Sequence, residues 1–196
     1  MQKTLTPKVM IFIAVGVVFN IVLTMVANTI GGGILFLDTV GTIFVAALLG
    51  PIPGVLTGIL TNLVNGVLVG PTEIPFLLVN AAVGLIVGFA AKKTQDYNLP
   101  TAIIVGLILA VVAPLIGTPI ALWLFGGLTG SGMDFLVIWL KSAGQGIFSA
   151  VFLTKILNNL ADKVLSSLLV FGALQALPLS VLQDSVLDKL KARKSK

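Results

Sequence analysis

The chain has 196 residues, of which 57% are apolar and 10% are charged, with a net charge of +5 and a mean hydropathy of +1.13. A soluble domain needs roughly 25% charged residues to cover its surface, so this composition excludes a soluble globular fold and predicts an all-α, multi-pass membrane protein. Because the sequence contains no Cys and no His, it also excludes thiolate and imidazole chemistry and metal sites built from those ligands.

The first predicted span covers residues 8–28. It is too long for the apolar core of a signal peptide and no small-residue cleavage site follows, so we expect it to be retained. The glycines at 31–33 end it, and Asp38 follows as the single charge between Lys8 and Glu73. Asp38 is interpreted as the cap of the next helix or as a group that reaches into a polar site, and the cap is preferred.

Glycine and proline divide the next apolar runs into separate spans. The turn "GPIPG" separates a short span 2 (38–49) from span 3 (51–69), and "GPTEIP" precedes span 4 (74–91). The polar loop "KKTQDYNLP" leads to span 5 (100–126), which two internal prolines are expected to kink. Small residues at helix-packing spacing predict close helix contacts at Gly54/Gly58, Gly84/Gly88 and Gly106/Ala110.

The stretch from Met133 to Pro178 cannot be one span, because its 46 residues would form a helix about 69 Å long in a hydrocarbon core about 30 Å thick. One interpretation places two spans here, 134–154 and 164–183, giving seven in total. The other places an outer segment before a sixth span at 157–178. The positive-inside rule favours the second, because it leaves nine basic residues, including Lys3, on the side of both termini and three on the other side: Lys141, Lys155 and Lys163.

The sequence therefore predicts six transmembrane helices with both termini in the cytoplasm. Residues 1–180 form a single transmembrane domain, and residues 181–196 form a basic cytoplasmic tail. We expect this tail to contain a short amphipathic helix and to lie near anionic lipid.

Polar side chains gather in the outer half of the predicted bundle. Asn62 and Asn65 share one face of span 3, and Glu73 and Asn80 lie in the outer part of span 4. Because an amide or charge in hydrocarbon needs a partner or water, this convergence predicts an outward-facing polar pocket.

Each of these residues also has a structural interpretation. Asp38 and Glu73 can cap helices, the asparagines can form interhelical hydrogen bonds, and Trp123 can anchor span 5 at the membrane surface. Asp162 and Lys163 are adjacent in sequence, so we expect separate partners for them rather than a local ion pair.

Three stretches carry a resemblance to a known family: "LDTVGTIFVAALLGPIPGVLTGILTNLVNG", "FGGLTGSGMD" and "ADKVLSSLL". With the six-span layout, they make residues 8–180 resemble the substrate-binding S components of energy-coupling factor (ECF) transporters, closest to the riboflavin-transporter-like branch. The resemblance implies a subunit that captures a vitamin or related micronutrient from outside. It also implies docking on a transmembrane coupling protein and two cytoplasmic ATPases. The chain itself has no G-x-x-x-x-G-K-[ST] phosphate loop.

The resemblance further implies that Asn159 and Lys163 hold the ligand. We expect Trp123 to stack on a ligand ring and residues 127–156 to form a glycine-hinged lid. The candidate binding residues are Asp38, Asn62, Glu73, Asn80, Trp123, Lys141, Gln145, Asn159 and Lys163. The family's docking patch, Ala-x-x-x-Ala on the first helix, corresponds here to "AVGVVFN", with Ala14, Gly16 and Val18.

Two other functions are considered. A membrane-embedded hydrolase or transferase needs an acid–base pair or a metal cluster, and scattered carboxylates without His or Cys supply neither. The alternative is a free-standing secondary transporter or channel for a small polar solute, although six short spans without inverted repeats fit that class poorly. We therefore expect a protein of the cell membrane with no enzymatic activity, cofactor, metal or nucleic-acid partner.

Overall fold

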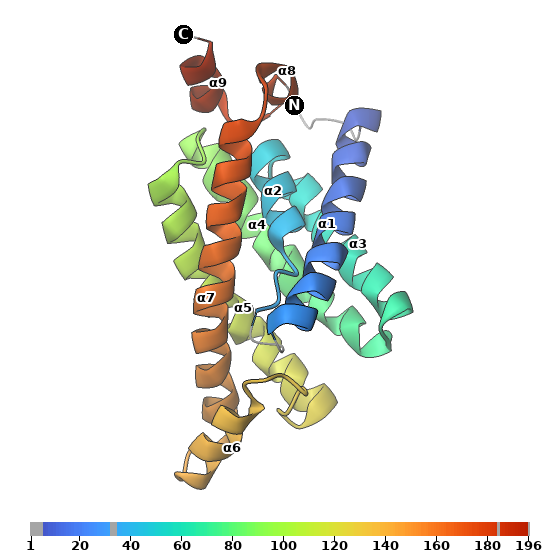
Figure 1. The fold of residues 1–196 in the computed structure, drawn as a ribbon, viewed down its shortest axis with the longest axis vertical. Helices are drawn as coiled ribbons and strands as arrows, with labels where there is room; N and C mark the ends of the chain where they lie inside the picture. Colours follow the sequence, from blue (N-terminus) through green and yellow to red (C-terminus); the bar gives the residue numbers. More distant parts are fainter. Residues whose placement is uncertain (1–5, 32–34, 184, 196) are drawn as a thin grey trace.

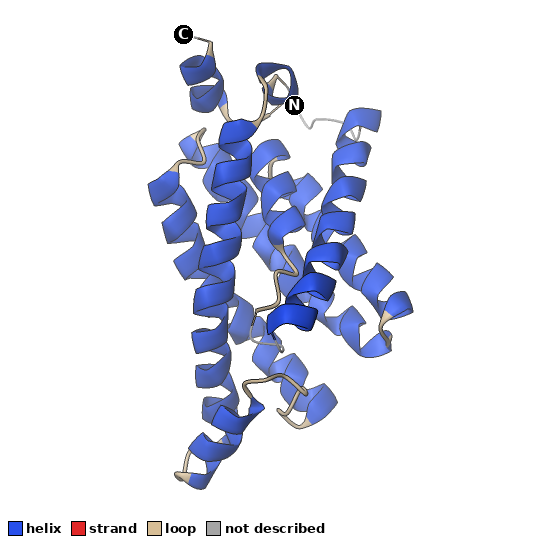
Figure 2. Ribbon diagram, in the orientation of Figure 1, coloured by secondary structure: helices blue, strands red, loops and turns tan. Residues whose placement is uncertain are grey.

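The computed structural model describes residues 6–31, 35–183 and 185–195, and the regular elements in these residues are all helical (Figure 2). Lys3 and the glycines at 32 and 33, which entered the sequence interpretation, lie outside the described residues. Within the described residues, five helices are long and apolar enough to cross a membrane, which confirms an all-α, multi-pass membrane protein. These are α1 (Pro7–Gly31), α3 (Pro51–Leu68), α4 (Leu77–Thr94) with the preceding 3-10 helix η1 (Pro71–Phe76), α5 (Leu99–Phe125) and α7 (Ile147–Ala176).

The predicted second span is the short helix α2 (Val40–Leu49). Ten helical residues rise about 15 Å, which is half of the hydrocarbon core. Eight of its residues are buried, and it packs against α1, α3, α4 and α7 in the interior of the bundle (Figure 1). The non-helical residues 35–39 lead into it. Such backbone is tolerated at membrane depth because protein covers it. A sixth crossing made by residues 35–49 together stays a prediction.

Glycines allow the helices around α2 to approach one another closely. A Cβ atom added to Gly41 would lie 1.9 Å from the carbonyl oxygen of Gly16, and one added to Gly84 would lie 2.4 Å from the carbonyl carbon of Gly54. A Cβ on Gly106 of α5 would lie 2.8 Å from Cα of Val164 on α7. The close contacts predicted from the glycine spacing are confirmed.

The same packing corrects the predicted docking patch on α1. Gly16 is buried against α2 and α3, where an added Cβ would contact Val45 and Thr57. Gly16 therefore belongs to the interior and cannot contact a partner. Ala14 and Val18 are exposed and lie one helical turn apart on the outer face of α1.

The C-terminal half contains one span rather than two. α6 (Asp134–Ser142) is short, and α7 is a continuous helix of 30 residues, about 45 Å long. The seven-span interpretation, which broke the chain between 154 and 164, is therefore wrong. The last span also begins ten residues earlier than predicted, so residues 147–156 belong to α7 and not to a lid.

The expected basic tail packs onto the bundle. It contains α8 (Leu179–Leu182) and α9 (Asp188–Lys194), and Leu182, Leu187 and Leu190 are buried in the main hydrophobic core. Arg193 pairs with Asp96 at 3.0 Å. Residues 185–195 are thus part of the fold and do not project from it.

The two ends of the bundle differ. α1 begins at the end where α9 lies, here called the terminal end, whereas η1 and α6 lie at the opposite end (Figure 1). The loop between α4 and α5 lies at the terminal end and contains Tyr97, whose side chain is fully buried. The hydroxyl oxygen of Tyr97 lies 2.6 Å from Oγ of Ser167. Burial raises the pKa of Tyr97 above its ordinary value, so its hydroxyl keeps its proton at neutral pH.

The contact between Gly16 and Gly41 leaves no space for a side chain, so Gly41→Ala should destabilise the protein by about 1–3 kcal/mol or more. The control is Gly172→Ala on α7, where an added Cβ meets no atom within 4 Å and where alanine favours the helix. Thermal unfolding in detergent should show an earlier transition for the first variant only. Equal unfolding temperatures would contradict the packing of α1 on α2.

Candidate functional site

A cavity of about 530 Å³ lies in the half of the bundle that is closer to η1 and α6. Its wall is built by α1, the segment 35–39, α3, η1, α4, α5, the loop after α5 and α7. Six of the nine candidate binding residues line it: Asp38, Asn62, Glu73, Asn80, Asn159 and Lys163. The structure thus brings these six together, and their role as ligands stays a prediction.

The other three candidates do not line this cavity. Trp123 is 77% exposed. It lies two residues before the lining residue Phe125, which places it on the opposite side of α5. Its expected stacking role is therefore wrong, whereas an anchor at the membrane surface fits its exposure. Lys141 and Gln145 are also exposed, at the end of α6 and in the loop that follows it.

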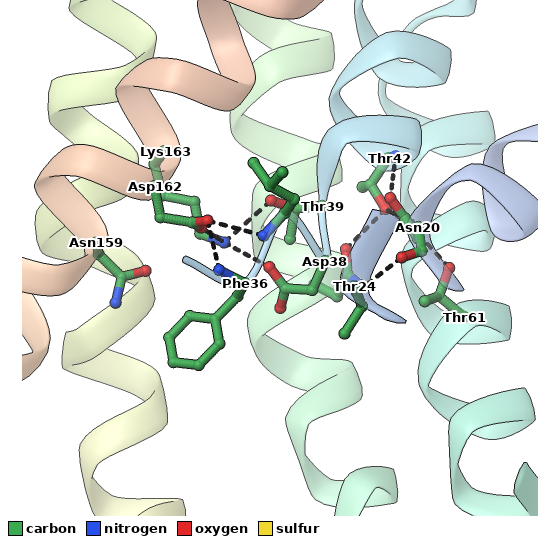
Figure 3. A network of polar contacts seen from close by, with 12 residues as sticks. Asn20, Thr24, Phe36, Asp38, Thr39, Thr42, Thr61, Asn159, Asp162 and Lys163 are labelled. Carbon is green, nitrogen blue, oxygen red and sulfur yellow. Dashed lines mark hydrogen bonds and ion pairs between the residues drawn. The ribbon is translucent and has the colours of Figure 1, made fainter. Parts of the chain in front are cut away.

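A charged cluster, drawn in Figure 3, contributes Asp38 and Lys163 to the cavity wall. Nζ of Lys163 lies 2.7 Å from a carboxylate oxygen of Asp38 and 2.7 Å from one of Asp162, and it donates a hydrogen bond to Oγ1 of Thr39 at 3.0 Å. We call these four residues the Lys163 cluster. The side chains of Lys163 and Asp162 are 3% and 0% exposed, whereas that of Asp38 is 41% exposed. The expectation of separate partners for the adjacent Asp162 and Lys163 is wrong, because the long lysine side chain reaches both carboxylates.

The Lys163 cluster holds the segment 35–39 in place. The second oxygen of Asp162 accepts hydrogen bonds from the backbone N–H groups of Phe36 at 2.9 Å and Leu37 at 2.8 Å. Leu37 adopts a left-handed conformation with φ of 49°. Asp38 is not the cap of α2, since Thr39 occupies that position. Its carboxylate is committed to Lys163 instead, so the preferred interpretation of Asp38 is wrong.

A chain of buried amides and hydroxyls connects α1 to the cavity. The side-chain nitrogen of Asn20 donates to Thr42 and Thr61, both at 2.9 Å, and its oxygen accepts from the backbone of Gly41. Thr42 then donates to Asn80 at 2.7 Å.

The chain continues across α4 and α3. Asn80 donates to Asn62 at 3.0 Å, and Asn62 donates to the backbone carbonyl of Glu73 at 3.1 Å. The interhelical interpretation of these two asparagines is therefore confirmed. Both asparagines also line the cavity. Part of their hydrogen-bonding capacity is already used by the bonds between helices.

Among the cavity residues absent from the predicted set are Lys155 and Asn65. Lys155 lies one turn before Asn159 and two turns before Lys163, so the three share one face of α7. This spacing was available in the sequence, but the predicted span began after Lys155. Asn65 shares a face of α3 with Asn62, as the sequence indicated, and it lines the cavity together with Asn62.

The arrangement is suited to binding a polar solute. The wall combines amides, hydroxyls and charges with the rings of Phe36, Phe76 and Phe125. Among the described residues no group of three His, Cys, Asp or Glu side chains could hold a metal ion.

Removal of Lys163 would leave Asp162 buried without a counter-charge. Lys163→Met should therefore lower the free energy of unfolding by about 3–5 kcal/mol. Asp38→Asn should cost less, because Asp38 is half-exposed and Asp162 still neutralises Lys163. The double variant Lys163→Met/Asp162→Asn should recover part of the loss, since the amide oxygen still accepts the two backbone N–H groups. Unfolding in detergent measures the order of stability among the variants. The prediction is contradicted if Lys163→Met is as stable as Asp38→Asn or more stable.

Comparison with known proteins identifies the family but adds no relative. No curated protein and no solved structure matches the chain. A family described as 5TMR of 5TMR-LYT matches residues 1–131, which include α1 to α5. The matched part contributes Asp38, Asn62, Glu73 and Asn80 to the cavity, whereas the α7 residues lie beyond it. Since the match covers more than half of the sequence, the chain belongs to the five-transmembrane family 5TM-5TMR_LYT.

Proposed function

We propose that this protein is a non-catalytic, solute-binding membrane subunit that captures a small, vitamin-like molecule from outside the cell. In this proposal it acts as the S component of an ECF-type importer and delivers the solute by docking on a shared ATP-driven module. The observation that carries the proposal is the polar cavity of about 530 Å³, within the size range of small-molecule sites.

The distribution of basic residues supports an outward-facing cavity. Lys8 at the start of α1, Lys92 and Lys93 at the end of α4, and four basic residues of α9 belong to the terminal end. Because basic residues next to spans remain in the cytoplasm, the terminal end is proposed to be cytoplasmic. The cavity, in the opposite half, then receives solute from outside. Six crossings, with residues 35–49 as the second, place both termini in the cytoplasm.

The segment between α5 and α7 is proposed as a lid. Gly126, Gly127 and Gly130 have positive φ angles, which glycine adopts without strain. The loop residues Thr129 to Ser131 line the cavity. Asp134, at the start of α6, accepts hydrogen bonds from the backbone of Thr129 and Gly130, so loop and α6 form one unit that can move on the glycines.

The exposed face of α1 is the proposed docking surface. Ala14 and Val18 lie there, one turn apart, with small or smooth side chains. Residues of this kind let another helix approach closely within a membrane.

The partner experiment tests the ATP-driven part of the proposal. Affinity purification of the tagged protein from native membranes should recover one membrane protein and two ATPases. Val18→Trp should reduce this recovery several-fold, because the ring blocks close helix approach, and it should leave solute binding unchanged. The control is Leu107→Trp, on an exposed position of α5.

Two results would overturn this part of the proposal. One is the absence of ATPases from the purified material. The other is solute uptake that persists after the ATPases are deleted, which would favour a free-standing transporter instead.

The binding step is tested at Asn65. Its side chain lines the cavity and has no hydrogen-bond partner within the described residues, so Asn65→Ala should not destabilise the fold. Loss of its bonds to a solute should lower affinity by about tenfold. The readout is the amount of small molecule that co-purifies with the protein, measured by mass spectrometry. Gln183→Ala, on an exposed residue after α8, is the control, and equal retention by both variants would place the solute outside this cavity.

A further inference from the structure

Two opposite charges on the cavity wall have no direct partner among the described residues. Lys155 of α7 forms no hydrogen bond or ion pair through its ammonium group, and Glu73 of η1 forms none through its carboxylate. They do not pair with each other. Both are partly buried rather than fully solvated.

The carboxylates that act on Lys155 are already committed. Asp134 and Asp38 are its electrostatic neighbours. Asp134 accepts hydrogen bonds from Thr129, Gly130 and Ser131, and Asp38 pairs with Lys163. Within the part of the chain that the structure describes, Lys155 therefore has acidic neighbours but no direct hydrogen bond or ion pair, and its ammonium group lines the cavity.

Lys163 shows what a charge at this depth requires. It lies on the same face of α7, two turns from Lys155, and forms ion pairs with two carboxylates. A charge within a membrane protein is stable only with a partner or with water. The described residues supply ion-pair partners to Lys163. The charged groups of Lys155 and Glu73 can be paired only by water or a molecule bound in the cavity.

We propose, on the basis of the proposed function, that the captured solute is a zwitterion. Its anionic group, a carboxylate or phosphate, binds Lys155, and its cationic group, a protonated amine or ring nitrogen, binds Glu73. Its apolar body lies against the rings of Phe36, Phe76 and Phe125. A solute with only one charge would match one of the two side chains and leave the other uncompensated.

The test identifies the molecule that the protein binds and removes the charges of Lys155 and Glu73 one at a time. Wild-type protein is purified from membranes in mild detergent, the bound small molecules are released with acid, and they are identified by mass spectrometry. The same is done for Lys155→Gln and Glu73→Gln. The matched controls are Lys93→Gln, an exposed lysine at the end of α4, and Asp188→Asn, an exposed acid of α9.

The expected result is a molecule with both an anionic and a basic group, enriched by the wild type and by both controls. Lys155→Gln and Glu73→Gln should each carry at least about tenfold less of it. Lys155→Arg should restore retention, which separates a loss of charge from a loss of folding.

The outcomes that overturn the inference are distinct from those that overturn the proposed function. If the enriched molecule is uncharged or has charges of one sign, or if both glutamine variants retain it as the controls do, the zwitterion inference fails and solute capture stands. If the wild type enriches no molecule over the same purification from membranes that lack the protein, both fail.

Discussion

The position of the Lys163 ammonium group between two carboxylates is the constraint on which the rest of the bundle depends. The ammonium group pairs with one carboxylate oxygen of Asp162. The other oxygen of Asp162 accepts hydrogen bonds from the backbone of residues 36 and 37 and so orients this backbone. Lys163 also holds Asp38 at the border of the cavity. Without this attachment, the non-helical segment 35–39 would have no fixed course through the membrane. The short helix α2 can be enclosed by its neighbours because the segment before it is anchored to α7.

The long spans were predictable because their signals are local. Apolar runs bounded by glycine and proline give the limits of α1, α3 and α5 to within a few residues. Glycine spacing gave the close contacts, since a missing side chain has the same consequence in any helix pair. α2 and the start of α7 were not predictable in this way. The length of α2 depends on protein covering its ends. The apolar first turns of α7 follow the polar, glycine-containing stretch 141–146 and precede Lys155, so composition alone did not indicate that they belong to the last span.

The cavity was partly predictable for a related reason. Amides and charges in apolar helices need partners, so their convergence indicated a common site, and six of the nine predicted residues line it. The sequence could not indicate on which side of its helix each side chain lies. It also could not indicate which polar groups already form hydrogen bonds with residues far away in the sequence. Trp123 points away from the cavity. Thr42, on α2, donates to the oxygen of Asn80 and itself accepts from Asn20 on α1.

The amide chain from Asn20 to the Glu73 carbonyl has a mechanical consequence. Asn62 cannot rotate toward a guest molecule without releasing Asn80 or the backbone of η1. If the Asn80 amide then rotates, its oxygen, which accepts from Thr42, moves as well, and Thr42 is bonded to Asn20 on α1. A rearrangement of side chains at the cavity is therefore transmitted to α1. The membrane-facing surface of α1 can then differ between the empty and the filled state of the cavity.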